Sequence, residues 1–138
     1  MAVIEVAPDG DLRGVADAVL AGLRPGDAVH LSGPVGAGKT ALVRACCIAL
    51  GVDEPVTSPT FALAHRYQGH VPVAHLDLYR LADQPPRDPA DLLGELEAEA
   101  LAFVEWPEAG ASWLPAPVRR VAIAVAADGV RTFAIDAL

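Results

Sequence analysis

The chain has little positive charge and no long apolar run. Ten of its 138 residues are lysine or arginine, against 18 aspartates and glutamates, so the formal net charge is −8. Because nucleic-acid backbones recruit clustered lysine and arginine, the lack of any basic run excludes broad nucleic-acid binding by this chain alone. Despite a mean hydropathy of +0.36, no apolar stretch reaches the roughly 18 residues of a membrane-spanning helix. The first residues also lack the pattern of a signal peptide, so the predicted location is the cytoplasm.

Cysteine is scarce, and the histidines are scattered. Cys46 and Cys47 are adjacent in a predicted helix, where neighbouring side chains point in different directions, so an ordinary disulfide or a shared metal is excluded. Both cysteines are predicted to be small core residues. No metal-ligand spacing connects the histidines, which are predicted to lie at strand ends or on the surface; they are His30, His65, His70 and His75.

Lysine is the scarcest charged residue, because Lys39 is the only one and the other nine cationic side chains are arginine. It lies in residues 33–40, which match Gly-x-x-x-x-Gly-Lys followed by Ser or Thr, the phosphate-binding loop. Glycines let backbone N–H groups turn around a phosphate, and the lysine reaches the outer phosphates as a compact charge. The Thr40 hydroxyl is placed to bind Mg²⁺. The alternative is a glycine-rich turn with an incidental lysine.

The loop has the flanking elements that the motif requires. Residues 27–32 follow a Pro-Gly turn and are mostly apolar, which predicts a buried strand. Residues 40–50 have helical apolar spacing and stop at Gly51, a favourable residue after a helix C-terminus. The helix N-terminus would add partial positive charge to the phosphate site. This order of strand, loop and helix favours the phosphate-binding interpretation.

The remaining pattern predicts one α/β domain over residues 1–138, with a P-loop NTPase-like three-layer fold around a mixed parallel and antiparallel sheet. A helix is expected over residues 11–23, capped by Asp11 or Asp9, and another from Asp88 to about Ala100. The other expected strands cover residues 3–6, 61–67, 71–78, 101–104, 118–125 and 130–135. Residues 68–70 and 126–129 are predicted hairpin turns.

Two carboxylates stand where a partner of the phosphate loop is expected. Asp77 and Glu105 each end a hydrophobic strand, and such a carboxylate orients Mg²⁺ directly or through water. Spacing does not decide which one is closer to the metal, and either can be the polar end of a buried strand. Thr60, in a Ser-Pro-Thr turn, is a candidate switch-like residue near a γ-phosphate, with a turn-forming threonine as the alternative.

Four blocks, in their order and spacing, resemble the bacterial TsaE family. They are the loop at 31–40, Ser-Pro-Thr-Phe at 58–61, His-Leu-Asp-Leu-Tyr-Arg at 75–80 and Val-Glu-Trp-Pro at 104–107. The resemblance covers about residues 11–135. It implies a Mg²⁺-dependent ATPase needed to form N6-threonylcarbamoyladenosine at position 37 of tRNA. Its implied partners are TsaD, which transfers the threonylcarbamoyl group, and TsaB, with tRNA held mainly through that complex.

The resemblance also implies residue roles. Thr40 and Glu105 would bind Mg²⁺, and Asp77, Glu105 and Thr60 would form the catalytic group. Trp106 would pack beside the site. The residues implied to hold ATP are Gly33, Gly36, Ala37, Gly38, Lys39, Thr40 and Ala41, with Asp11 and Arg131 as further nucleotide contacts and Arg80 as a second arginine that organises the site.

The chain departs from the family at two of these positions. Pro34 replaces an acidic residue of the family loop, which removes a carboxylate and a backbone N–H. Asp11 stands where relatives have a threonine that approaches the nucleotide. Phosphate binding by residues 36–40 is expected to survive the change to Pro34, because it depends on the later part of the loop.

Two other functions fit part of the sequence. A nucleotide-binding adaptor with negligible turnover needs only to bind the phosphates. The absence of a loop carboxylate at Pro34 favours this function. A small-molecule kinase needs an acceptor pocket and an arginine-bearing lid. Residues 83–88 are the candidate lid, with Arg87 as its arginine. Measured ATP turnover separates these functions.

Overall fold

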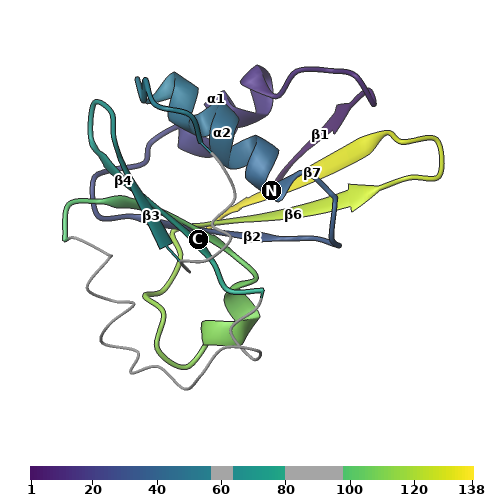
Figure 1. Cartoon of the computed structure of the whole chain (residues 1–138). Coiled ribbons are helices and arrows are strands. Elements are labelled where there is room, and N and C mark those ends of the chain that lie inside the picture. The colour runs from purple at the N-terminus through teal and green to yellow at the C-terminus, as the bar shows by residue number, and fades with distance from the viewer. Residues whose placement is uncertain (57–63, 80–97) are drawn as a thin grey trace.

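The computed structural model describes residues 1–56, 64–79 and 98–138, and a seven-stranded mixed sheet in the order β1-β7-β6-β2-β5-β4-β3 forms its centre (Figure 1). The strands are β1 (Ala2–Val6), β2 (Ala28–Ser32), β3 (Ala64–Gln68), β4 (Pro72–Asp77), β5 (Leu101–Glu105), β6 (Arg119–Val125) and β7 (Arg131–Ala137). The helices are α1 (Arg13–Leu20), α2 (Lys39–Ala49) and the short 3-10 helix η2 (Pro107–Gly110). Most of the helix predicted up to Ala100, and the start of the strand predicted over 61–67, lie outside the described residues.

Strand directions confirm the predicted mixed α/β fold. β2 runs parallel to β5 and β6, and β5 runs parallel to β4. The pairs β1–β7, β6–β7 and β3–β4 are antiparallel. Because the carboxyl ends of parallel strands meet at one edge of a sheet, β2, β5 and β4 deliver the residues after them to the same place.

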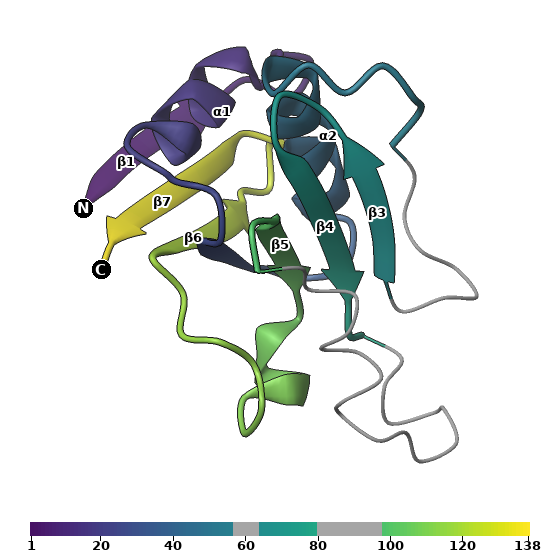
Figure 2. The ribbon, with the colours of Figure 1, turned by 90° about the vertical axis from the view of Figure 1, so that its left-hand side faces the viewer.

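The two α-helices pack on the same face of the sheet, as Figure 2 shows. Alternating strand residues such as Leu31, Phe103 and Phe133 point toward them and are fully buried. The intervening residues, including Leu76 and Val104, form a second cluster with Trp113 and Leu114 from the segment after η2. The centre of the sheet, strands β2, β4 and β5, is therefore covered on both sides, which explains their nearly continuous apolar sequences.

Helix boundaries differ from the predictions by a few residues. α1 begins at Arg13 rather than Asp11, although the Asp11 carboxylate accepts the Arg13 N–H at 3.0 Å. α2 ends at Ala49, and Gly51 then adopts a φ of 80°, as expected of a glycine after a helix. Among the described residues no helix has the length and apolarity to span a membrane.

The cysteine prediction is confirmed, because Cys46 and Cys47 lie in α2 and are both fully buried in the hydrophobic core. Burial raises the pKa of the Cys47 thiol to about 12, and burial likewise raises the pKa of Cys46. Both thiols therefore stay protonated and unreactive at neutral pH.

The hairpin turn between β3 and β4 approaches the end of α2 so closely that only glycine fits. A Cβ on Gly69 would lie 2.4 Å from the carbonyl oxygen of Leu50, which accepts the His70 N–H at 2.7 Å. We expect Gly69→Ala to lower the free energy of unfolding by about 1–3 kcal/mol, because two backbone segments must separate. Chemical denaturation measures the change.

Gly14→Ala is the matched control for this variant. Gly14 lies in α1, and a Cβ there would meet nothing within 4 Å. Alanine is the better helix former, so this variant should gain about 0.5–1 kcal/mol. Equal unfolding free energies for the two variants would contradict the close approach of the hairpin to α2.

Candidate functional site

The loop between β2 and α2 is shaped by its glycines. Gly33, Gly36 and Gly38 adopt φ values of 154°, 80° and 110°, which other residues rarely adopt. A Cβ on Gly33 would also lie 2.8 Å from the carbonyl oxygen of Ile123 in β6. Gly38 then forms the N-cap of α2, so the backbone N–H groups of the first helical turn face the loop.

Lys39 reaches back over the loop from the first position of α2. Its Nζ donates to the carbonyl oxygens of Gly33 at 2.6 Å and Pro34 at 2.9 Å, and lies 4.2 Å from the centroid of the Trp106 ring. The side chain is only 5% exposed. Burial lowers the pKa of Lys39, while the negative charge of Glu105 opposes that shift. A phosphate would compete with two neutral carbonyls for this ammonium.

Glu105 ends β5 directly beside the loop. The Thr40 hydroxyl lies 2.9 Å from its Oε2 and 3.2 Å from its Oε1, and His75 Nε2 lies 2.5 Å from the same Oε2. Glu105 is 3% exposed, and His75 is fully buried. The carboxylate is therefore held between a side chain of α2 and a side chain of β4.

Asp77 ends the neighbouring strand, in register with Glu105. Its Oδ1 accepts the Tyr79 N–H at 3.1 Å, and the Tyr79 ring lies 4.8 Å from the Trp106 ring between centroids. Trp106 itself has a φ of 58°, a left-handed conformation that is uncommon for a bulky side chain. Lys39, Thr40 and these side chains line a cavity of about 290 Å³ at the loop.

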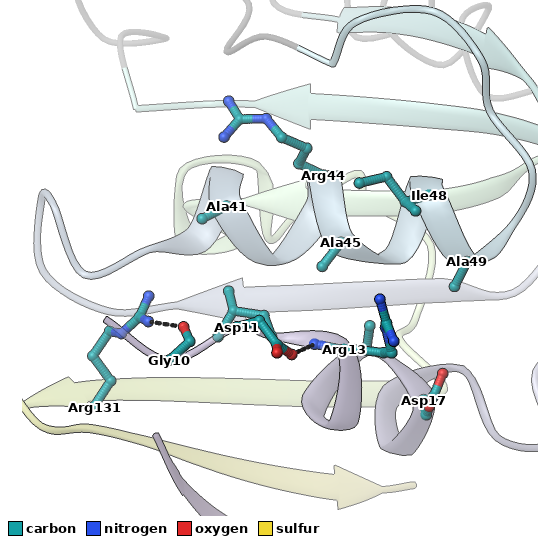
Figure 3. Close-up of a pocket in the computed structure, with 12 residues that line it drawn as sticks. Gly10, Asp11, Arg13, Asp17, Ala41, Arg44, Ala45, Ile48, Ala49 and Arg131 are labelled. Atoms are coloured by element: carbon teal, nitrogen blue, oxygen red, sulfur yellow. Dashed lines mark hydrogen bonds between the residues drawn. The ribbon is translucent and has the colours of Figure 1, made fainter. Parts of the chain in front are cut away.

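A larger cavity of about 610 Å³ lies between α1 and α2 (Figure 3). Asp11 lines it from the segment just before α1, while Ala45 and Ile48 line it from α2. Arg131 lies at its end and donates from Nη2 to the Gly10 carbonyl at 3.2 Å. A Cβ on Gly38 would lie 3.2 Å from Nη1 of the same arginine. Ala41 lines both cavities, so they meet at the first turn of α2.

Comparison with known proteins decides the family. The family model described as "Threonylcarbamoyl adenosine biosynthesis protein TsaE" matches residues 8–133. The chain belongs to the TsaE family. The tRNA threonylcarbamoyladenosine biosynthesis protein TsaE of Treponema pallidum is 36% identical over 115 residues, which cover 82% of this chain and 84% of that protein. The Bacillus subtilis protein of the same name is 30% identical over 129 residues, covering 93% and 80%.

A shorter match and a solved structure extend the comparison. The TsaE protein of Mycobacterium leprae is 48% identical over 96 residues, which cover 61% of this chain and 58% of that protein, less than two thirds of its length. The crystal structure of Bacillus subtilis YdiB matches the fold with a TM-score of 0.75 at 26% identity, covering 99% of this chain and 86% of that chain.

The structure brings most of the predicted TsaE-type site residues together. Glu105 touches Thr40, whereas Asp77 lies one strand further away and lines the same cavity. Asp11 and Arg131 line the adjoining cavity. Thr60 and Arg80 lie outside the described residues. The roles assigned to these residues remain predictions.

The placement predicted for His75 was wrong. It was expected at a strand end or on the surface, but it is buried inside β4 and contacts Glu105. Its position two residues before Asp77 was the available signal, because strand residues at that spacing share a face of the sheet. Spacing between histidines alone could not indicate this role.

The donor set of this TsaE-family site fits Mg²⁺. Thr40 has a single hydroxyl proton and Glu105 accepts it, so the lone pairs of the hydroxyl oxygen remain available to a cation. The described residues contain no group of three or more His, Cys, Asp or Glu side chains that could hold a metal. A Mg²⁺ ion here would therefore take its remaining ligands from phosphate and water, as this ion commonly does.

Proposed function

We propose that this TsaE-family chain is a Mg²⁺-dependent ATPase that supports formation of N6-threonylcarbamoyladenosine on tRNA, with TsaD and TsaB as its protein partners. Family membership and the printed name of the relatives support the tRNA-modification role. The observation that carries the ATPase proposal is the contact of Thr40 with Glu105 beside a glycine loop that ends in Lys39. This combination suits a nucleoside triphosphate with a bound cation.

The smaller cavity is the proposed triphosphate site. Backbone N–H groups at the N-terminus of α2 would surround the phosphates, and Lys39 would exchange its two loop carbonyls for phosphate oxygens. Thr40 and Glu105 would hold Mg²⁺, which when bound would offset negative charge on the phosphate oxygens. Asp77 is the side chain proposed to orient water at the rim of the cavity.

The larger cavity is the proposed nucleoside site. Its apolar wall on α2, which includes Ala45 and Ile48, offers a surface for a base. Asp11 uses one carboxylate oxygen for the Arg13 N–H, so its other oxygen can accept a ribose hydroxyl. Arg131 lies between this cavity and the loop, where it can meet a phosphate oxygen.

An adaptor with negligible turnover is the second candidate. Pro34 supplies neither a carboxylate nor an N–H, and its carbonyl binds the Lys39 ammonium at 2.9 Å. Neither feature adds a group that activates water, and the backbone N–H groups at the start of α2 remain to bind phosphate. The candidate lid of the kinase alternative, residues 83–88, lies outside the described residues.

Phosphate release tests the proposal. We expect the chain to hydrolyse ATP when Mg²⁺ is present, to stop in EDTA, and to turn over faster when purified TsaD and TsaB are added. Modification of tRNA in the complete mixture should require all three proteins and ATP. ATP binding without phosphate release under either condition would favour the adaptor, and absence of ATP binding would contradict the proposed function.

A further inference from the structure

A histidine with no access to solvent lies behind the carboxylate of Glu105. His75 has no exposed surface and sits in β4, two residues before the position that pairs with Glu105 in β5. Its Nε2 lies 2.5 Å from Glu105 Oε2. A carboxylate can only accept a hydrogen bond, so beside a carboxylate form of Glu105 the imidazole is the donor through Nε2. The contact therefore joins the parallel strands β4 and β5.

The two donors to Glu105 come from different directions. Thr40 approaches from α2 and lines the smaller cavity together with Glu105. His75 is not among the residues that line either cavity, so it contacts the carboxylate from the protein interior. A ligand that enters the cavity would therefore meet the contact between Thr40 and Glu105 before the contact between His75 and Glu105.

Packing alone does not account for an imidazole at this position. Among the described residues its buried Nδ1 has no hydrogen-bond partner, and an unsatisfied buried polar atom costs free energy. An apolar side chain of similar size would fill the space without that cost. Imperfectly satisfied polar groups in a core concentrate where function requires them.

We propose that His75 is a positioning residue, which holds the Glu105 carboxylate so that its remaining lone pairs face a Mg²⁺ ion in the loop cavity. The inference rests on the proposed Mg·ATP function. Groups that orient a metal-binding side chain typically contribute about 10- to 100-fold to metal affinity. His75 itself touches neither metal nor nucleotide.

Two variants separate the hydrogen bond from the packing. His75→Met has similar length and no donor, whereas His75→Gln keeps an N–H group near the position of Nε2. Isothermal titration calorimetry with ATP, once in Mg²⁺ and once in EDTA, gives the factor by which Mg²⁺ tightens binding. We expect His75→Met to reduce that factor by about 10-fold or more, and His75→Gln to keep it within about twofold of the wild type. ATP affinity in EDTA should stay within about twofold in both variants.

Each outcome decides the inference. It is overturned if His75→Met keeps the wild-type Mg²⁺ factor, or if both variants lose it equally. A wild-type protein whose ATP affinity ignores Mg²⁺ would instead contradict the proposed function. If thermal unfolding shows that His75→Met does not fold, His75→Asn replaces it, because its amide is too short to reach Glu105 and the same loss is expected.

Discussion

Lys39→Ala is expected to weaken ATP binding by about 100-fold or more while the protein stays folded. Lys39 is 5% exposed, its ammonium is held by two loop carbonyls, and it is the one cationic side chain among the described residues that line the smaller cavity. Removing a charge-assisted contact to phosphate from a largely buried position costs about 2–5 kcal/mol, and 2.7 kcal/mol corresponds to a factor of 100. Calorimetry with Mg·ATP measures the loss, and thermal unfolding checks the fold.

Arg24→Ala is the matched control for the charge. It removes one positive charge from an exposed turn before β2, and ATP affinity should stay within about twofold of the wild type. An equal loss in both variants would show that net charge, rather than the loop, governs binding.

Lys39→Arg separates the shape of the ammonium from its charge. The space around Nζ is bounded by the Gly33 and Pro34 carbonyls and by the Trp106 ring at 4.2 Å. A planar guanidinium is larger and holds its donors in a fixed fork, so it should fail to replace the lysine. ATP affinity near the wild-type value in this variant would contradict the loop geometry.

The loop itself was predictable because its information is local. A strand, a glycine pattern and a helix follow one another within 25 residues, and residues 28–49 form those elements in that order. Spacing along the chain could not show which of the two carboxylates, Asp77 or Glu105, lies closer to the loop. That depends on β5 lying between β2 and β4, which is a pairing of segments far apart in the chain. That topology places Glu105 beside the loop and Asp77 one strand away.

Two further features depend on tertiary packing that the sequence pattern does not encode. The left-handed backbone of Trp106 places its ring against both Lys39 and Tyr79, and no local signal marks a tryptophan for that conformation. His75 is buried because β4 is covered by strands on both sides and faces α2, so a polar residue in an apolar run becomes a partner of Glu105. Trp106 and His75 therefore contact residues of the site, although neither belongs to the phosphate-loop motif.

The strand order leads to a test of which carboxylate would hold Mg²⁺ in the proposed site. Glu105→Gln keeps the shape of the side chain but removes its charge, and we expect the factor by which Mg²⁺ tightens ATP binding to fall by about 100-fold or more. Asp77→Asn is the same change on the adjacent strand and should alter that factor by less than about threefold, while lowering ATP turnover. Calorimetry in Mg²⁺ and in EDTA, together with phosphate release, distinguishes the two effects.

The thermal stability of the nucleotide-free protein should not fall in Glu105→Gln, in contrast to the expected loss of the Mg²⁺ effect on ATP binding. The carboxylate is 3% exposed, so replacing it with a neutral amide removes the cost of desolvating a charge. Glu105→Gln is therefore expected to unfold at a temperature equal to or above that of the wild type, although it should lose the effect of Mg²⁺ on ATP binding. A variant that loses both stability and the Mg²⁺ effect would mean that Glu105 acts mainly as a structural partner of His75 and Thr40. Equal Mg²⁺ factors for the Glu105 and Asp77 variants would contradict the assignment of the metal to the β5 carboxylate.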